Sequence, residues 1–515
     1  MIINYYKFIW ERNKIIMKTK KILCLLTVIA LLFLFSCKGS DKSGISAPSN
    51  SDTSDNSDIL NNSDDSFVSE KDEPVENPLY IDDLPEENYN GNKFNMLTCE
   101  YLYTNAKLVV EEQTGDVIYD SIYLANRTVE DRFNIEFEEL YTPDIREMSA
   151  YVKKTVDSGD NAYDFVFILD RDAISLAMKD KYFYSMDELP YVNLDKLYWD
   201  QELKKSLTID NTLYFTYGAN MLSIYDNINF LVYNKQIAAE LALENIYDVV
   251  RNGKWTIDKM YEMAAAATKD LDGDGVMTKG DRWGVSHFFG SYYPSFWEAE
   301  KIPLVAKDEN DLPYFNVPGN EKLFTLFEKL YAYSTGGYEY NEMSDCKEVF
   351  ENGRALFYSS TMHGVQSLRA METDYGIVPY PSMAEKSPGD PYVGRISVGF
   401  PLIVPVTADA ERASVIMEAL ACQYQKLVIP VYYENAVQIK STRDEESIEI
   451  LDMLTKNRFL DFGDTYWTND VRDKYTDIFM LQTNNFQSAT EKMEKNVAKI
   501  LDKAIAAFQN VKGGE

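Results

Sequence analysis

Histidine and positive charge are scarce in this 515-residue chain. Only two histidines occur, His287 and His363, so few side chains can act as general acids or bases near neutral pH. The 51 lysines and arginines are outnumbered by 83 aspartates and glutamates, and the net charge is −32. Contacts with phosphate groups and with anionic lipid both need basic patches. The charge balance therefore argues against nucleic acid as a partner and against adhesion to an anionic membrane surface.

Cysteine is also sparse. Of the five cysteines, Cys24 and Cys37 belong to the N-terminal signal described below, and Cys99, Cys346 and Cys422 remain. Three is an odd number, and these residues lie far apart in the sequence. A disulfide framework is therefore not expected, and the three thiols are predicted to be buried as small apolar groups.

The apolar run near the N-terminus is too short for a membrane-spanning helix, which needs ~20 apolar residues. It covers residues 22–35 and follows three lysines at positions 18, 20 and 21. A basic segment, a short apolar segment and a small residue at the break are typical of a secretory signal. Translation is expected to start at Met17. A plain N-terminal membrane anchor is the alternative, and both place the rest of the chain outside the cytoplasm.

The end of this signal resembles a bacterial lipobox. Residues 34–37 read Leu-Phe-Ser-Cys, with Phe35 bulkier than the motif usually carries. The resemblance implies that the thiol of Cys37 takes a diacylglycerol, which would anchor the chain to the extracytoplasmic face of the cell membrane.

Residues 38–91 change character and are rich in Ser, Asp, Asn and Glu. Between residues 38 and 90 there are 14 acidic and three basic residues. Such a segment cannot bury enough apolar surface to offset the entropy of ordering. It is predicted to be a disordered tether.

From residue 92 on, the pattern predicts an α/β fold. The run YDFVFIL at 163–169 is nearly all apolar, which is typical of a strand buried on both faces. Strands and helices alternate here, which favours a parallel sheet covered by helices, with ligands bound beyond the carboxyl ends of the strands. The chain is long enough for two such domains. Predicted strands are 95–103, 135–140, 163–169, 212–217 and 229–233; predicted helices are 116–133, 144–158, 173–179, 254–268, 321–334, 345–352, 409–425, 446–457 and 489–509.

Residues 270–281, DLDGDGVMTKGD, have the spacing of an EF-hand calcium loop. Oxygen-bearing side chains occupy positions 1, 3, 5, 9 and 12, a glycine at position 6 permits the sharp turn, and position 7 offers its carbonyl. A helix is predicted before the loop and a strand after it, so a single structural Ca²⁺ clip is favoured over a paired sensor. An Asp-rich turn without metal is the alternative. The candidate ligands are Asp270, Asp272, Asp274, Val276, Thr278 and Asp281.

Four stretches of the chain, in this order, resemble bacterial extracellular solute-binding proteins of the family-1 type, the sugar-binding receptors of ABC importers. They are NIYDVVRNGKWTIDK at 245–259, the loop DLDGDG…DRWG, FENGRALFYSSTMHGVQSLRAMETDYGIVPYP at 350–381 and YVGRISVGFPLIVPVTAD at 392–409. The resemblance covers most of residues 92–510.

The resemblance implies a two-lobed periplasmic-binding-protein-like (type II) fold that closes on a ligand through hinge crossings, expected near 226–229, 382–394 and 455–465. A single large α/β domain is the alternative. The expected organisation is 1–37 signal peptide with lipobox, 38–91 tether, 92–228 first part of lobe I, 229–385 lobe II with the loop 270–281, 386–458 return part of lobe I, and 459–515 C-terminal helical segment, mainly of lobe II.

A sugar-binding role suits a chain with 37 Tyr, 26 Phe and 6 Trp, because aromatic faces cover sugar rings and polar groups fix the hydroxyls. Most of these aromatics must be core. In the maltose-binding protein, the turn that aligns with residues 359–363 of this chain carries a tryptophan that stacks on the sugar. Met362 or His363 occupies that place here. For each candidate a structural role is the alternative: a charge pair, a helix cap or a core position. The candidate ligand contacts are Asp170, Arg171, Tyr217, Trp297, His363 and Arg395.

The expected function is a monomeric, non-enzymatic substrate-binding lipoprotein that delivers a small solute, most simply an oligosaccharide, to ABC permease subunits. The chain has no Walker motif and no permease segments, so transport would need separate subunits. A surface sensor or adhesin is one alternative. A secreted glycan-active enzyme is another, although no G-x-S-x-G or H-E-x-x-H motif occurs.

Overall fold

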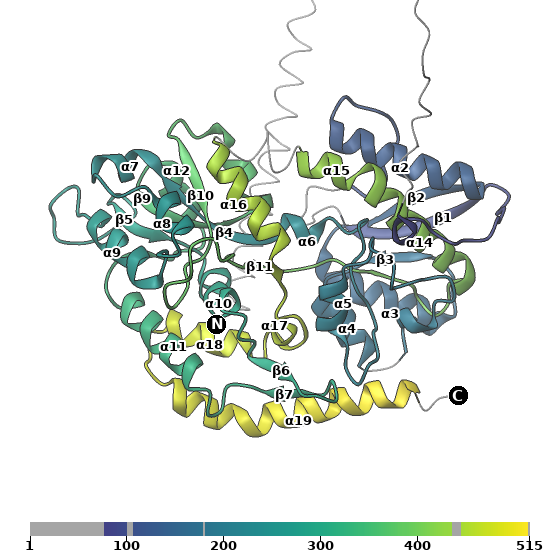
Figure 1. Cartoon of the computed structure of the whole chain (residues 1–515). Helices are drawn as coiled ribbons and strands as arrows, with labels where there is room; N and C mark the ends of the chain where they lie inside the picture. Colours follow the sequence, from purple (N-terminus) through teal and green to yellow (C-terminus); the bar gives the residue numbers. More distant parts are fainter. Residues whose placement is uncertain (1–76, 100–106, 179–180, 435–443, 513–515) are drawn as a thin grey trace, which may run out of the picture. The chain divides into compact units, whose positions relative to one another are not determined.

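The computed structural model describes residues 77–99, 107–178, 181–434 and 444–512, and these contain two large β-sheets, each covered by helices, and one two-stranded sheet (Figure 1). The signal, Cys37 and the tether up to residue 76 lie outside the described residues. Among the helices of the described part, none combines the length and the apolar character needed to cross a membrane.

The first sheet defines the first lobe and has the strand order β12-β3-β1-β2. Strands β1, β2 and β3 are parallel, and β12 pairs with β3 in the antiparallel direction. The predicted β-α-β-α-β series therefore forms the expected parallel sheet. The strands are β1 Asn92–Cys99, β2 Ile135–Thr142, β3 Phe165–Phe167 and β12 Leu402–Ile403; the helices of this lobe are α2 Val117–Phe133, α3 Met148–Ser158, α4 Asp170–Ala177, α5 Gln201–Leu207, α6 Ser223–Asp226, α14 Ala410–Leu427 and α15 Ile429–Tyr432.

Helix α2 shows why these segments fold locally. The carboxylate of Asp116 accepts the backbone N–H groups of the first turn, and Asn134 ends the helix in the left-handed region with φ 51°. Its buried residues Ile122, Val129 and Phe133 follow helical spacing, and the helix packs against α14 and β2.

The second sheet defines the second lobe and has the order β13-β11-β4-β9-β5-β8, with β10 also paired to β4. Strand β4 is buried along its whole length, as its apolar sequence INFLVYN requires. The strands are β4 Ile228–Asn234, β5 Trp283–Ser286, β8 Glu339–Tyr340, β9 Ala355–Thr361, β10 Tyr375–Val378, β11 Gly394–Ile396 and β13 Arg458–Phe459; the helices are α7 Lys235–Glu240, α8 Ile246–Arg251, α9 Ile257–Ala267, α10 Phe289–Ala299, α11 Glu321–Ser334, α12 Cys346–Glu351, α13 Met362–Val365 and α16 Glu445–Lys456.

The chain passes between the two sheets three times: from α6 into β4, from β11 to β12, and between α15 and α16. The two-lobed α/β fold that was predicted is therefore confirmed. The expected boundaries at residues 385 and 458 stay predictions, although β11 and α16 both pack with the second sheet.

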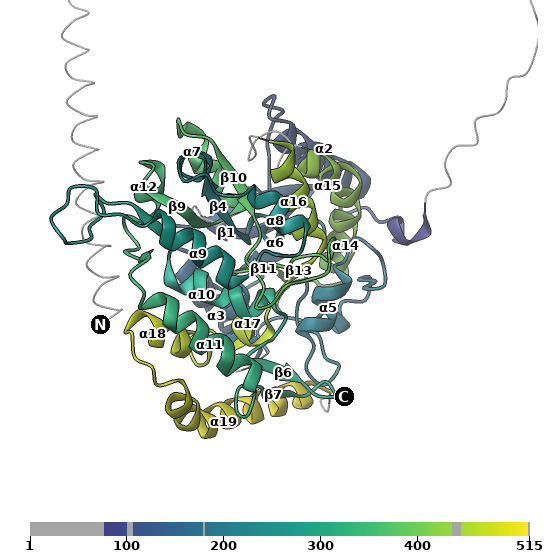
Figure 2. The ribbon, with the colours of Figure 1, turned by 60° about the vertical axis from the view of Figure 1, so that its left-hand side comes forward.

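A small hairpin and three C-terminal helices complete the described residues. The hairpin consists of β6 Val305–Lys307 and β7 Pro313–Phe315, and the helices are α17 Phe462–Trp467, α18 Arg472–Met480 and α19 Phe486–Lys512. Figures 1 and 2 both show α19 along the lower edge, directly below β6 and β7.

Two local predictions differ from the structure. Residues 212–217 form no regular strand; Thr212 and Gly218 make only isolated bridges, and aromatic contacts such as Tyr214 on Phe183 bury the segment instead. The aromatic stretch 292–297, which is absent from the predicted helices, lies in α10 and is buried. In both cases the apolar run alone does not distinguish a strand from a helix or an irregular segment, and side-chain packing selects the conformation. The thiols of Cys99, Cys346 and Cys422 are buried, as predicted.

Candidate functional site

Asp170 and Tyr217 are the two predicted ligand contacts that the structure brings together. Asp170 follows β3 and begins α4, as the sequence placed it, and its side chain is 4% exposed. Its carboxylate accepts the backbone N–H of Gly399 at 2.9 Å and that of Arg171 at 2.7 Å, and the Tyr217 hydroxyl donates to it at 3.4 Å. Burial raises the pKa of Asp170 to about 6. The pair lies where the crossing from β11 to β12 meets the first sheet.

Arg171 and His363 are the two accessible candidates. Arg171 is exposed at the first turn of α4. His363 is half-buried in α13 of the second lobe, and α13 contacts α6 of the first lobe. The ring atom Nδ1 of His363 has no hydrogen-bond partner among the described residues. Both side chains therefore stay predicted ligand contacts.

Arg395 lies in a buried ion-pair network. It is 1% exposed, its Nε donates to Glu298 Oε1 at 2.5 Å, and its Nη2 pairs with Asp464. Arg472 also reaches Asp464, at 2.8 Å. Burial raises the pKa of Glu298 well above its ordinary value, and the charge of Arg395 acts in the opposite direction. In this arrangement Arg395 links α10, β11 and α17 within the second lobe.

Trp297 is fully buried on α10 and packs edge-on against Phe327 of α11, with ring centroids 5.7 Å apart. No face of its indole reaches solvent. A contact with a ligand at Trp297 would need a rearrangement of this core, and its role stays a prediction.

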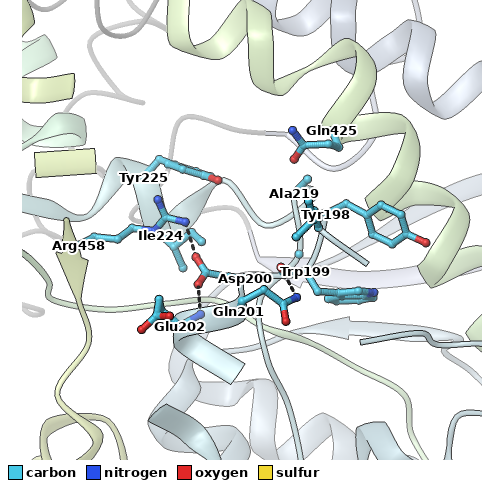
Figure 3. Close-up of a pocket in the computed structure, with 12 residues that line it drawn as sticks. Tyr198, Trp199, Asp200, Gln201, Glu202, Ala219, Ile224, Tyr225, Gln425 and Arg458 are labelled. Atoms are coloured by element: carbon cyan, nitrogen blue, oxygen red, sulfur yellow. Dashed lines mark hydrogen bonds and ion pairs between the residues drawn. The ribbon is translucent and has the colours of Figure 1, made fainter. Parts of the chain in front are cut away.

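A cavity of about 200 Å³ at the junction of the lobes was not anticipated from the sequence (Figure 3). Arg458 of β13 enters it from the second lobe and pairs with Asp200, the residue that caps α5. The Arg458 guanidinium also lies 4.7 Å from the centre of the Tyr225 ring, and burial raises the pKa of Tyr225 to about 12. Because 258 positions separate Asp200 from Arg458, no sequence motif could have joined them. The other lining residues are Leu197, Tyr198, Trp199, Gln201, Glu202, Gly218, Ala219, Ile224 and Gln425.

The predicted calcium loop lies between α9 and β5, as expected. Carboxylate oxygens of Asp270, Asp272 and Asp274 lie within 4.8 Å of one another. Backbone N–H groups, first that of Gly275, lower the pKa of Asp270, which keeps this carboxylate charged. Asp281 is turned inward and accepts the N–H groups of residues 271 and 278 at 2.9 and 2.8 Å. Three converging carboxylates are the donor set that a hard cation such as Ca²⁺ prefers. The carboxylates at positions 1, 3, 5 and 12 all accept backbone N–H groups of the loop itself. The carbonyl of Val276 and the hydroxyl of Thr278 complete the predicted set.

The chain is similar in fold to solved sugar-binding proteins. The sugar-binding protein MalE from Xanthomonas citri superposes with a TM-score of 0.55 at 14% identity, over 82% of this chain and 100% of that one. An ABC substrate-binding protein from Listeria monocytogenes in complex with cycloalternan gives 0.53 at 10% identity, over 80% and 99%. The GacH receptor of Streptomyces glaucescens, solved unliganded and with acarbose, gives 0.51 at 12%, over 80% and 99%.

At these identities the structures establish the fold alone. A comparison with curated protein sequences finds no match. The profile of the family described as "Bacterial extracellular solute-binding protein" matches residues 127–423, which are 297 of the 515 residues. Because this match spans more than half of the chain, the protein belongs to the bacterial extracellular solute-binding proteins.

Proposed function

We propose that the protein captures a small oligosaccharide between its two lobes, outside the cytoplasm, and delivers it to the permease of an ABC importer. The observation that carries the proposal is the family match together with a two-lobed fold shared with proteins solved with cycloalternan and with acarbose. Capture by closure requires that the ligand makes better contacts in the closed arrangement than in the open one. Contacts from both lobes supply that difference, and Arg171 and His363 are accessible groups on opposite sides of the junction.

A thermal-shift screen tests capture directly. Maltotetraose, cycloalternan and acarbose are added to the purified protein, and a ligand present at 100 times its Kd adds about 2.7 kcal/mol of stability. Arg171→Ala should weaken that shift. Arg127→Ala is the matched control, because Arg127 is also an exposed arginine on a first-lobe helix. A panel of oligosaccharides that leaves the melting temperature unchanged contradicts sugar capture.

The proposal includes no chemical change of the ligand. Prolonged incubation of the protein with maltotetraose should return only maltotetraose in a chromatogram. Shorter products would indicate a glycan-active enzyme instead.

Anchoring and delivery are separate parts of the proposal. We infer that the thiol of Cys37 is lipidated, which predicts incorporation of labelled fatty acid in cells and its loss in Cys37→Ser but not in Cys24→Ser. Delivery predicts that uptake of the captured sugar stops when the gene is deleted. Binding without any effect on uptake would favour a surface sensor.

We also propose that residues 270–281 hold a structural Ca²⁺. Calorimetry should detect binding that Asp272→Ala removes and that Glu309→Ala, an exposed acidic residue of the β6–β7 turn, leaves intact. Chelation should lower the melting temperature without abolishing folding, since binding to the folded form adds stability. An unchanged melting curve after verified removal of divalent ions would count against the site.

A further inference from the structure

The β6–β7 hairpin is fixed at its base to the second lobe. The backbone N–H of Leu304 donates to Asp461 Oδ2 at 3.3 Å, just before α17. A Cβ atom added to Gly463 would lie 2.9 Å from the Cβ of Val305, so α17 and β6 are in tight contact. On its other side, β7 packs against α19.

The same hairpin reaches α5 of the first lobe through Lys307. Its ammonium group donates to the carbonyl of Lys205 at 2.6 Å, to that of Thr208 at 3.1 Å and to the Thr208 hydroxyl at 2.9 Å. Thr208 is the C-terminal cap of α5. The last carbonyls of a helix lack partners within the helix, and a cation there is favoured by the helix dipole. Lys307 therefore satisfies the end of a helix that belongs to the other lobe.

Asp311, at the turn of the hairpin, makes the second set of contacts. Its carboxylate accepts the Thr208 hydroxyl and the Asn211 N–H, both at 2.9 Å, and its carbonyl accepts the Asp210 N–H at 3.0 Å. Lys307 pairs with the same carboxylate at 2.6 Å, and both side chains are 18% exposed. Partial burial limits screening by solvent, so these contacts are stronger than a surface pair of the same length.

Helix α19 provides a third contact. With 27 residues it is about 40 Å long, at 1.5 Å per residue. Its first residue, Phe486, packs on Phe327 and Phe479 of the second lobe, each with ring centroids 5.1 Å apart. Near its other end, the fully buried Phe508 packs edge-on against Tyr214, with centroids 4.7 Å apart.

Tyr214 and the end of α5 belong to the first lobe. The N–H of Met186 donates to the carbonyl of Leu213 at 2.9 Å, and the ring of Phe183 lies 5.7 Å from that of Tyr214. Phe183 in turn bridges to Pro405, two residues after β12 of the first sheet. Helix α17 adds one more link, because the Tyr466 hydroxyl donates to the carbonyl of residue 207 at 2.7 Å.

We propose that these contacts form a brace between the lobes that stays closed whether or not a ligand is bound, so that opening is a rotation about the brace. The brace consists of the β6–β7 hairpin and the end of α19 on one side and residues 205–214 on the other. Lys307, Asp311 and Phe508 act as positioning residues: they touch no ligand, and they limit the arrangements from which the lobes close. The inference rests on the proposed function in one respect, that the solute is held between the lobes.

Two distances measured by pulsed spin-label spectroscopy in the free protein test the brace. The full chain carries Cys24→Ser and Cys37→Ser, since the other three cysteines are buried. One label pair, Glu202→Cys with Asn310→Cys, spans the brace between α5 and the hairpin turn. The other pair, Leu124→Cys on α2 with Gln236→Cys on α7, spans the lobes on the upper side of Figure 1. All four positions are exposed.

The expected result is a narrow distance distribution across the brace and a broader one between α2 and α7. Asp311→Ala and Phe508→Ala should each broaden the brace distribution, and Glu309→Ala, an exposed residue of the same turn, should not. A brace distribution in the unsubstituted chain as broad as the α2–α7 distribution overturns the proposal. So does a distribution that Asp311→Ala and Phe508→Ala both leave narrow.

Maltotetraose, added as the probe ligand, separates this inference from the proposed function. It should shorten or narrow only the α2–α7 distance, while a brace distance that shifts with the sugar contradicts a permanent brace. If releasing the brace leaves about a tenth of the molecules in the competent arrangement, the apparent Kd of the variants rises about tenfold. A sugar that does not bind at all counts against the proposed ligand, and the distances in the free protein still decide the brace.

Discussion

Removing the positive charge of Arg395 should be among the most costly single substitutions in this protein. Arg395 is 1% exposed and is the cation nearest to Glu298, whose side chain is 0% exposed. Arg395→Met keeps much of the side-chain volume and leaves Glu298 buried without its partner. Asp464 keeps Arg472 at 2.8 Å, so the uncompensated charge is that of Glu298. Breaking a buried ion pair by removing one partner costs about 3–5 kcal/mol, and we expect a loss of that size in the free energy of unfolding.

The loss should depend on pH. Burial already raises the pKa of Glu298 well above its ordinary value, and removing Arg395 takes away the charge that opposes this shift. A carboxyl group whose pKa is higher in the folded state stabilises that state at low pH, and the contribution disappears as pH rises through the folded pKa. The gap between the unsubstituted protein and Arg395→Met should therefore be smaller near pH 5 than near pH 8.

Urea denaturation at the two pH values, followed by circular dichroism, measures both effects. The companion variant is Arg395→Met with Glu298→Gln, which replaces the stranded carboxylate by a neutral amide and should recover part of the loss. The reasoning is refuted if Arg395→Met costs less than about 1 kcal/mol, as surface substitutions do. It is also refuted if the double variant is no more stable than the single one.

Three further outcomes follow from buried groups. Burial raises the pKa of Asp170 to about 6 from 3.8, so its contribution to stability is present below about pH 4 and is lost as pH rises through about 6. Between these limits the unfolding free energy of Asp170→Asn, measured by urea titration, should rise by up to about 3 kcal/mol relative to that of the unsubstituted protein. Trp297→Ala should lose about 3–5 kcal/mol of unfolding free energy, because its side chain is fully buried, and a loss under about 1 kcal/mol would show that the indole is not core. Lys196→Met should speed proteolysis around residues 78–83, because the buried Lys196 ammonium holds the carbonyls of Pro78 at 3.2 Å and Ile81 at 2.7 Å; equal cleavage of both proteins would contradict this.

Periodicity and apolar runs were sufficient to predict an α/β fold with a parallel sheet, because strands buried on both faces have a direct signature in sequence. The two-lobed arrangement was expected from the family resemblance. The run NFLVY became β4, and the predicted parallel order of the first sheet was confirmed. The same signature was wrong for residues 212–217, which are equally apolar. Burial there comes from side-chain packing without a neighbouring strand, and a run of apolar residues carries no information about its partner.

The candidate site was predictable only in part, for a similar reason. The position of Asp170 follows from the end of a strand, whereas its contact with Tyr217 is visible only in the structure. No sequence pattern could reveal that Arg395 forms an ion pair with Glu298 inside the second lobe, since 97 positions separate the two residues. A charged residue beside a crossing looks the same in sequence whether it faces a ligand or a buried carboxylate.

Helix α5 shows how the two lobes are joined by charges that are far apart in sequence. At its N-terminal end, Asp200 caps the helix and pairs with Arg458 of the second lobe. At its C-terminal end, Lys307 of the second lobe donates to the last carbonyls. An anion at the start of a helix and a cation at its end are both favoured by the dipole, so each contact stabilises α5 while it holds the other lobe. In a chain with so large an excess of acid, positive groups placed at both ends of one short helix offset the repulsion between two acidic lobes where they meet.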